Sequence, residues 1–399
     1  MCASMPAARS TWSAPTAPAA TASAWPRPGR RWRAVVAASS DPRFRVHAVP
    51  TRFTPWSHVA ALHSPRGDNM TTRIKLIAAA ALAVCMVSPA MAADKIALVV
   101  KSLGNGFFDA AHQGALEAAK ELKDVEIIYT GPAKATAEGQ IEIINSLIAQ
   151  NVKAIVISAN DPDALVPSLK KAMSRGIKVI SFDSGVKKEG RLMQLNPSNS
   201  ALIGEKLVKM SEQVVGKTGE IAVLSATAQA TNQNIWIGEM KKVLAQPGYS
   251  GLKLVNVVYG DDQTDKSYRE AQGLFKSYPN LKAIVAPTTV GIAAAAKAVQ
   301  DEKKVGQIFV TGLGLPSEMA GHVKSGAVKS FAIWNPIDLG YSSIHIAHAF
   351  MKGKAKGTAG EKISLGRVGT TTLDANLEGA MAEPFTYDAG NVEQFAKIF

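Results

Sequence analysis

Charged side chains occur in this sequence at points where apolar runs end. Lys101 follows the apolar run 96–100, and Asp161 and Asp183 follow the runs 154–158 and 178–182. An ammonium group donates hydrogen bonds and a carboxylate accepts them, so both can bind the hydroxyl groups of a ligand. We therefore expect a binding site for a hydroxyl-rich ligand where these runs end.

Asn232, Gln233 and Asn234 form a second polar group, three amides in succession at the start of a predicted helix. One amide is enough to cap a helix N-terminus. The others offer paired donors and acceptors, which again suit a ligand rich in hydroxyl groups. Pro287 and Thr289 end another apolar run and are expected to shape the wall of the same site.

Aromatic residues accompany these polar groups. Phe107 and Phe108 lie in the turn 101–109, and Trp334 stands beside Asn335 at the end of the last apolar run of this kind. Sugar rings stack their C–H faces on aromatic side chains while their hydroxyls bind amides and carboxylates. The three aromatics are predicted as platforms for such a ring, with Asn335 as a polar contact.

Each of these residues also has a structural interpretation. Asp161 precedes a predicted helix and could serve only as its N-cap, whereas Asp183 leads into a charged loop. The two Phe and Trp334 could fill the core instead of facing a ligand. The sequence leaves open which Phe faces the ligand.

No enzyme motif accompanies these residues. Residues 311–317 imitate a dinucleotide-binding loop, but Ser317 replaces the third glycine and Pro316 is typical of a helix start. His345 and His348 stand three apart without an HExxH motif, and no G-x-S-x-G motif occurs. We predict no catalytic residue, no metal and no cofactor. The alternative of another class, a soluble α/β enzyme acting on a sugar or a nucleotide, would require a complete phosphate loop.

Strands and helices are expected to alternate from residue 96 onward. Short apolar runs predict buried strands, and the stretches between them place apolar residues at helical spacing. The strand predictions cover residues 96–100, 125–129, 154–158, 178–182, 220–224, 253–259, 283–286, 307–311 and 329–333. Two series of this alternation indicate an α/β fold with two parallel sheets covered by helices, in which ligands bind at the carboxyl ends of the strands.

Residues 1–69 differ from the rest of the chain in composition. They contain nine Arg, no Lys and two Asp, whereas residues 70–92 combine a short basic start, an apolar stretch and the small-residue pattern Ala90-Met91-Ala92. The second segment is typical of a secretory signal peptide, which works only at an N-terminus. We therefore interpret 1–69 as a non-native, disordered extension and 70–92 as the signal peptide.

The formal net charge of +13 falls to +4 once the +7 of residues 1–69 and the two basic residues of the signal peptide are set aside. That balance is ordinary and does not predict a nucleic-acid partner. Both cysteines, Cys2 and Cys85, precede residue 93, so the mature chain needs no disulfide. A lipid anchor at Cys85 is disfavoured because Val84 stands where a small residue is expected.

The order of these segments resembles the periplasmic sugar-binding proteins of ABC importers, and among them the rhamnose-binding proteins. The matching segments are 101–108, 158–165, 183–185, 232–236, 285–291, 311–319 and 331–340, together with the signal peptide. The resemblance covers residues 70–399. It implies a type I periplasmic binding fold, with two doubly wound parallel-sheet lobes joined by three crossovers near 196, 335 and 384–391. The N-terminal lobe would comprise 93–195 and 336–383, and the C-terminal lobe 196–335 and 384–399.

The autoinducer-2-binding proteins are similar as well. Their site uses a Lys, two Asp, a Gln, a Pro and an Ala, and Lys101, Asp183, Gln233 and Pro287 match that pattern. Asn232 stands in place of the second Asp and Thr289 in place of the Ala. Loss of a carboxylate removes a strong acceptor, which disfavours autoinducer-2 as the ligand.

The resemblance implies a non-catalytic binding protein of the periplasm. Its expected ligand is a monosaccharide, L-rhamnose, with autoinducer-2 or a ribose-type sugar as alternatives. It would act as a monomer, closing its hinge around the sugar and passing it to a membrane-embedded ABC permease, with no nucleic acid involved. A sugar-sensing repressor would share the fold, but residues 1–69 lack the pattern of a DNA-binding headpiece.

Overall fold

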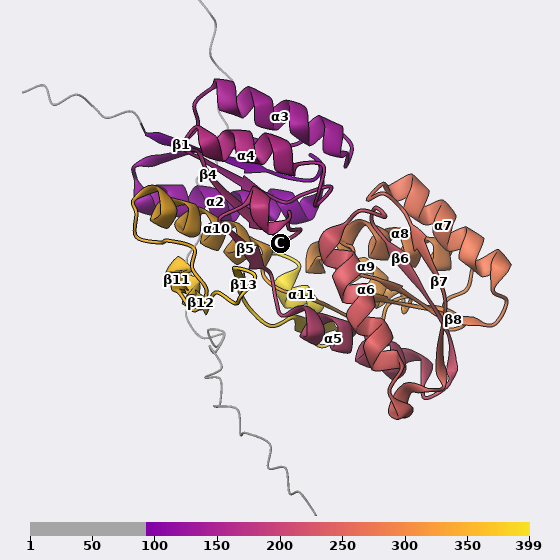
Figure 1. Ribbon diagram of the computed structural model, residues 1–399. Coiled ribbons are helices and arrows are strands. Elements are labelled where there is room, and N and C mark those ends of the chain that lie inside the picture. Colours follow the sequence, from indigo (N-terminus) through magenta and orange to yellow (C-terminus); the bar gives the residue numbers. More distant parts are fainter. Residues whose placement is uncertain (1–92) are drawn as a thin grey trace, which may run out of the picture. The chain divides into compact units, whose positions relative to one another are not determined.

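The computed structural model describes residues 93–399 (Figure 1), and the expectations for residues 1–92 lie outside this range. Its first sheet has six strands in the order β13-β5-β4-β3-β1-β2, and every pairing in it is parallel. The strands are β1 (Asp94–Val99), β2 (Val125–Thr130), β3 (Ala154–Ile157), β4 (Lys178–Phe182), β5 (Met193–Asn196) and β13 (Glu378–Ala380). We call this sheet with its helices the N-terminal lobe.

The second sheet has four parallel strands in the order β7-β6-β8-β9. They are β6 (Gly219–Ser225), β7 (Leu252–Tyr259), β8 (Leu281–Ala286) and β9 (Phe309–Gly312). An antiparallel pair, β10 (Ser330–Ile333) and β14 (Phe385–Asp388), continues beside β9 through a bridge between Leu313 and Ala332. These strands and their helices form the C-terminal lobe. Away from both sheets, β11 (Lys362–Ser364) and β12 (Thr370–Thr372) make a small antiparallel hairpin.

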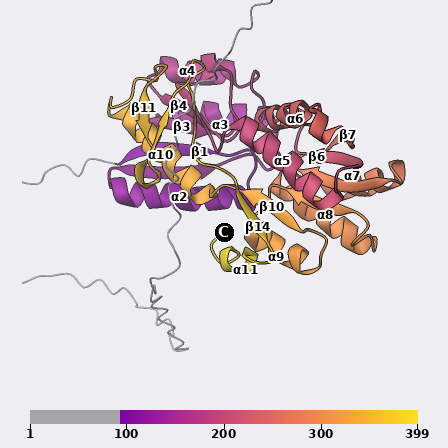
Figure 2. The same cartoon turned by 90° about the horizontal axis from the view of Figure 1, so that it is seen from below.

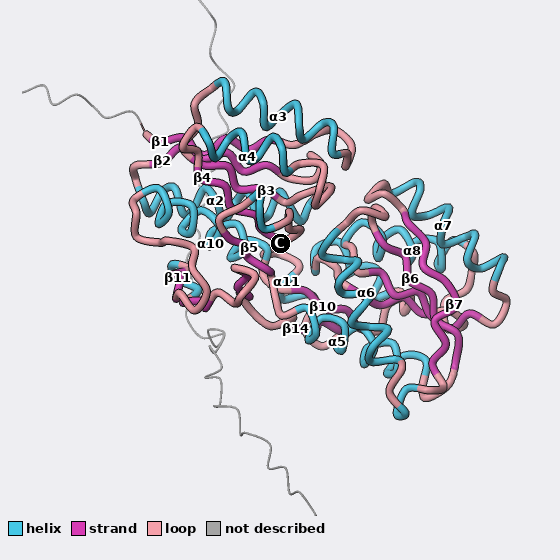
Figure 3. Tube along the Cα trace, viewed as in Figure 1, coloured by secondary structure: helices cyan, strands magenta, loops and turns pink. Residues whose placement is uncertain are grey.

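Helices connect most of the successive strands of the two parallel sheets, as the coloured tube in Figure 3 shows. They are α2 (Gly106–Leu122), α3 (Ala137–Ala149), α4 (Val166–Ser174), α5 (Ser200–Val215), α6 (Thr231–Leu244), α7 (Thr264–Ser277), α8 (Thr289–Asp301), α9 (Pro316–Lys324), α10 (Pro336–Met351) and α11 (Val392–Phe395). Short 3-10 turns cover Lys188–Gly190, Pro247–Tyr249 and Gly366–Val368. None of the helices between residues 93 and 399 combines the length and apolar character needed to cross a bilayer.

Both faces of the first sheet are buried. Ile96 and Leu98 of β1 pack in the cluster that contains α2, whereas Ala97 and Val99 pack with residues of α3 and α4. Successive side chains of a strand point to opposite faces, so a strand covered on both sides must be apolar throughout. This explains why the strands could be recognised as continuous apolar runs.

Helices α2 and α10 approach each other very closely in the N-terminal lobe. A Cβ added to Gly114 would lie 1.8 Å from the carbonyl oxygen of Ile337, and one added to Gly340 would lie 1.8 Å from that of Ala111. Helix backbones can approach this closely only where both surfaces lack side chains. Helix α10 therefore belongs to the N-terminal lobe, although it follows β10 of the other lobe in sequence (Figure 2).

The chain passes between the two lobes three times, after β5, after β10 and after β13. The predicted α/β fold with two parallel-sheet lobes and three crossovers is confirmed. The final crossover lies between Ala380 and Phe385, close to the start of the range expected for it. Strands β5 and β13 were not predicted, because polar residues interrupt β5 and β13 has no apolar run of its own.

Candidate functional site

The carboxyl ends of the strands of both lobes meet at a cavity. Its lining comes from turns and helix starts that follow strands far apart in sequence, which is the position expected for a ligand in sheets of this type. The lining residues are Lys101, Asn105, Phe107, Phe108, Asp183, Asn232, Gln233, Trp236, Asp262, Pro287, Thr288, Thr289, Leu313, Ile333 and Trp334. Nine of the twelve residues predicted as ligand contacts are among them.

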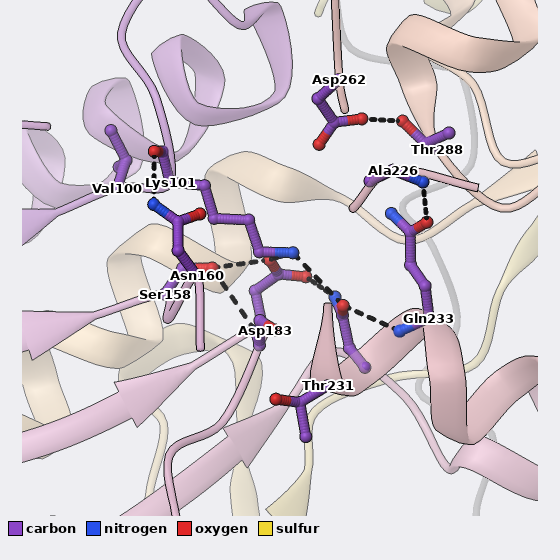
Figure 4. A network of polar contacts seen from close by, with 12 residues as sticks. Val100, Lys101, Ser158, Asn160, Asp183, Ala226, Thr231, Gln233, Asp262 and Thr288 are labelled. Carbon is purple, nitrogen blue, oxygen red and sulfur yellow. Dashed lines mark hydrogen bonds and ion pairs between the residues drawn. The ribbon is translucent and has the colours of Figure 1, made fainter. Parts of the chain in front are cut away.

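Lys101 and Asp183 form the polar wall of the N-terminal lobe (Figure 4). They are 4% and 5% exposed, and the Lys101 ammonium lies 3.8 Å from the Asp183 carboxylate. The hydroxyl of Ser158 donates to Asp183 Oδ2 at 2.8 Å. Asp183 has a φ of 55°, in the left-handed region that asparagine and aspartate tolerate better than most residues. This backbone bend directs the carboxylate toward Lys101 rather than along the strand.

Gln140, which is fully buried on α3, holds the ends of β1 and β3 together. Its Nε2 donates to the carbonyl oxygens of Val100 and Ser158 at 3.0 and 2.8 Å, and its Oε1 accepts from the Asn160 amide at 2.8 Å. Asn160 Nδ2 in turn donates to the Lys101 carbonyl at 2.9 Å. These bonds fix the backbone from which Lys101 projects. Sequence reasoning missed Gln140, since a glutamine within a helix carries no signal of such a role.

Asn232 and Gln233 supply the amides of the C-terminal lobe from the first turn of α6. The Oε1 atom of Gln233 accepts from the Ser225 hydroxyl at 2.7 Å and from the Ala226 amide at 2.8 Å. Gln233 Nε2 has no acceptor among residues 93–399, so this donor remains for a ligand. The side chain is thus held by its oxygen and presents its nitrogen.

Direct hydrogen bonds cross from one lobe to the other. Asn232 Nδ2 donates to Asp183 Oδ1 at 2.8 Å, and Lys101 Nζ donates to Asn232 Oδ1 at 3.3 Å. The hydroxyl of Thr231 donates to the Gly185 carbonyl at 3.0 Å. The structure therefore represents a closed arrangement in which polar groups of the two lobes satisfy each other.

Four aromatic rings line the apolar side of the cavity. Phe107 packs edge-to-face on Phe108 and on Trp334, with centroids 5.2 and 6.2 Å apart, and Trp334 packs in the same way on Trp236 at 5.6 Å. Phe108 also contacts Phe182 in the core at 6.5 Å. The two interpretations of these residues are thus compatible, because each ring is buried and also lines the cavity.

Asp262 is a cavity residue that sequence reasoning missed. It follows β7, has a φ of 51°, and accepts a hydrogen bond from the Thr288 hydroxyl at 2.5 Å through Oδ1. Burial of the carboxyl group raises the pKa of Asp262, and the Lys101 ammonium and the Thr288 hydroxyl act in the opposite direction. Gly260-Asp261-Asp262 does follow an apolar run, so the rule that singled out Asp183 would have found it.

Three predicted contacts are not among the residues that line this cavity, and each has a local hydrogen-bond partner instead. Asp161 accepts from the amides of residues 163 and 164 at 2.8 Å and so closes a local turn. Asn234 is exposed and donates to the Ala228 carbonyl. Asn335 caps α10, since its Oδ1 accepts from the Ile337 amide at 2.9 Å. Short polar side chains next to a helix start bind local backbone, and this local role prevailed at all three positions.

The glycine-rich segment 311–317 also has a structural explanation. Gly312 has a φ of 145°, and a Cβ there would lie 1.9 Å from the carbonyl oxygen of Ala286. Close contact between β9 and β8 therefore requires this glycine, with no need for a phosphate ligand. Among residues 93–399, no group of three or more His, Cys, Asp or Glu side chains is placed to hold a metal ion.

Comparison with known proteins agrees with this geometry. The family profile described as a periplasmic binding protein domain matches residues 96–355. The chain is similar to the D-ribose/D-allose-binding protein of Pseudomonas aeruginosa, with 30% identity over 250 residues that cover 60% of this chain and 76% of the relative.

Two solved structures extend the similarity. One is an ABC transporter solute-binding protein from Clostridium phytofermentas with bound L-rhamnose, 36% identical, covering 77% of this chain and 99% of its own, with a TM-score of 0.74. The other is LsrB from Clostridium saccharobutylicum in complex with AI-2, 21% identical, covering 75% and 99%, with a TM-score of 0.71. The second comparison concerns the fold alone.

Proposed function

The chain belongs to the periplasmic binding protein family, and from that premise we propose that it captures a monosaccharide, L-rhamnose, for delivery to an ABC permease. Membership of the family makes it a sugar-binding component of ABC transport rather than an enzyme. One observation supports a sugar as the ligand. Aromatic rings line one side of the cavity, and carboxylate, ammonium and amide groups line the other.

A pyranose ring has chemistry that matches both walls. Its C–H face would lie against Phe107 or Trp334, and its hydroxyls would bind Lys101, Asp183 and Gln233. The further contacts we propose are Phe108, Asn232, Pro287 and Thr289. L-rhamnose, a 6-deoxyhexose, also carries a methyl group that the apolar side chains of Leu313 and Ile333 would accommodate. The 36% identical structure with bound L-rhamnose supports this choice.

Hinge closure is the proposed mechanism of capture. The lobes meet at the cavity through the bonds of Asn232 and Thr231, and the chain crosses between them at three points. A ligand that contacts both lobes binds the closed arrangement better than an open one and shifts the population toward it. The permease would then meet a closed, loaded monomer in the periplasm, after cleavage of the signal peptide 70–92.

A ribose-type sugar is the second candidate, because the Pseudomonas relative is a D-ribose/D-allose-binding protein. Autoinducer-2 is less favoured, since Asn232 stands where the binding proteins for that ligand carry a second carboxylate. Both candidates predict the same site residues. They differ from L-rhamnose in which ring substituents must fit beside Leu313 and Ile333.

Thermal unfolding of the purified protein in the presence of single sugars tests the proposal. A ligand that binds only the folded state raises its stability, by about 2.7 kcal/mol at 100 times its Kd. L-rhamnose is expected to raise Tm, and D-ribose, D-allose and autoinducer-2 to raise it less. A clear rise with one of these compounds and none with L-rhamnose would replace the proposed ligand.

A further inference from the structure

The two carboxylates of the cavity differ in how far the protein already satisfies them. Asp183 is bound at both oxygens, since Oδ1 accepts from Asn232 and Oδ2 from Ser158, and the Lys101 ammonium is close by. Asp262 receives one hydrogen bond, from Thr288 to Oδ1. Its Oδ2 atom has no donor among residues 93–399. Asp262 is thus the cavity carboxylate with an unused acceptor in the closed arrangement.

The surroundings of Asp262 hold it in place. Gly260, two residues earlier, packs so tightly that an added Cβ would lie 2.0 Å from Ser267 Oγ. The Asp261 amide donates to the Ala226 carbonyl at 2.9 Å, next to the Ala226 amide that orients Gln233. Asp261 and Asp262 both have left-handed backbones, with φ of 56° and 51°. Such strain persists only where neighbouring structure over-determines it, and it is commonly found at ligand sites.

Asp262 also occupies the opposite side of the cavity from the other charged groups. Figure 4 shows Asp262 and Thr288 apart from Lys101 and Asp183, with Gln233 on the same side as Asp262. Asp262 follows a strand of the C-terminal lobe, whereas Lys101 and Asp183 follow strands of the N-terminal lobe. A ligand between them would meet a charged acceptor on each lobe.

We infer that Asp262 is a specificity-determining residue whose free oxygen accepts a hydrogen bond from one hydroxyl of the bound sugar on the C-terminal lobe. This inference rests on the proposed function and extends it. Asp183 then binds both the sugar and Asn232 of the other lobe, whereas Asp262 is the acceptor that the C-terminal lobe adds. Among the residues that line the cavity, Lys101 is the one cation beside two carboxylates, a balance that would favour neutral sugars over sugar acids.

The variant Asp262→Asn removes the charge while keeping the shape and tolerance of a left-handed backbone. We expect it to weaken L-rhamnose binding roughly 10- to 100-fold, the usual effect of losing a hydrogen bond to a charged group. Asp261→Asn is the matched control. It lies in the same loop with the same backbone, but its carboxylate binds Lys266 outside the cavity, so binding is expected to stay within about twofold of the native protein.

Monodeoxy analogues of L-rhamnose distinguish recognition from a general loosening of the loop. In the native protein, the analogue that lacks the hydroxyl read by Asp262 should bind roughly 10- to 100-fold more weakly than L-rhamnose, because the carboxylate is left unpaired. In Asp262→Asn that penalty should shrink to within about threefold, since a neutral amide is a weaker acceptor. Isothermal titration calorimetry provides both sets of constants, and circular dichroism confirms that each variant is folded.

Two outcomes would overturn the inference: native affinity in Asp262→Asn, or an equal loss for L-rhamnose and all its deoxy analogues. If L-rhamnose does not bind the native protein, the proposed ligand fails separately. The same comparison is then made with the sugar of the thermal-shift panel that does bind and its deoxy analogues. Asp262→Ala, which removes both oxygens, serves as the second variant and should lose at least as much affinity.

Discussion

The side-chain amide of Asn232 donates a hydrogen bond of 2.8 Å to the carboxylate of Asp183, 49 residues earlier and on the other lobe. Lys101 donates to the same asparagine from the Asp183 side. Asn232 thus joins the two lobes through groups that also line the cavity. In the proposed function, lobe closure and ligand recognition share these atoms, so a sugar would either bind around the pair or replace part of it.

Removing the Asn232 amide should favour the open arrangement in the absence of sugar. Asn232→Ala loses two hydrogen bonds that join the lobes through charged groups. A hydrogen bond to a charged group contributes about 1.5–3 kcal/mol to stability. Small-angle X-ray scattering of the sugar-free protein should show a larger radius of gyration than for native protein. Asn234→Ala, on the same helix but outside the cavity, is the control and should match the native value. An unchanged radius for Asn232→Ala would mean that this asparagine does not hold the lobes together.

Gln233→Glu tests which atom of the amide serves the ligand. The substitution keeps an oxygen to accept from Ser225 and Ala226 but removes the Nε2 donor that faces no acceptor in residues 93–399. Sugar affinity should fall roughly 10-fold or more, because a donor is replaced by an acceptor. Titration calorimetry provides the constant, with Asn234→Asp as the control. Native affinity in Gln233→Glu would remove Gln233 Nε2 from the proposed contacts.

Tryptophan fluorescence should report sugar binding directly. Trp236 and Trp334 are the two tryptophans between residues 93 and 399, and both line the cavity. A sugar bound beside an indole ring changes the polarity around that ring and the quenching of its fluorescence. Saturating L-rhamnose should therefore alter the emission spectrum. Trp236→Phe and Trp334→Phe should each reduce the response. A full response in both single variants would place the sugar elsewhere.

Gly340→Ala should destabilise the N-terminal lobe without touching the cavity. The added methyl group would lie 1.8 Å from the carbonyl oxygen of Ala111, so α10 must move away from α2. Overpacking of this kind costs about 1–3 kcal/mol or more in the free energy of unfolding. Urea denaturation measures the loss. Gly273→Ala is the matched control, because its α7 position has no neighbour within 4 Å, and it should stabilise the protein by about 0.5–1 kcal/mol.

His322 should make stability depend on pH. Burial, aided by Lys297, lowers the pKa of His322 below its value in the unfolded chain. Near pH 6 the unfolded state then binds more protons than the folded state does. The contribution of His322 to the free energy of unfolding is therefore complete above about pH 6.5 and is lost as the pH decreases below that value. His322→Gln should flatten the curve of stability against pH between about 5 and 7.5. An equally steep curve in the variant would assign the dependence to other groups.

Much of the site could be predicted from local sequence because the strands are buried on both faces. Continuous apolar runs such as residues 96–100 marked the strands, and parallel strands bring their carboxyl ends to one edge. Lys101, Asp183 and Gln233 could therefore be placed at one cavity without knowing the distances between them. Strands β5 and β13 escaped this reasoning, since neither is a continuous apolar run: β5 reads Met-Gln-Leu-Asn and β13 reads Glu-Gly-Ala.

The predicted contacts that do not line the cavity are residues of a type that can serve two purposes. Asp161, Asn234 and Asn335 have the polarity of ligand contacts, but each binds backbone or faces solvent within a few residues of its own position. Local hydrogen bonds of this kind and ligand contacts look alike in sequence. Only the direction of the side chain separates them, and that direction depends on packing.

The α/β class, the two series of strands and a polar, aromatic-lined site at the strand ends could all be inferred from apolar periodicity and from residue types at strand ends. Which polar groups meet depends on the packing of the two lobes. Asp262 and Lys101 line one cavity, and Asn232 bonds to Asp183, only because strands and helices of separate lobes are brought together. Such contacts depend on how two sheets pack, and no local pattern encodes a distance between residues that far apart.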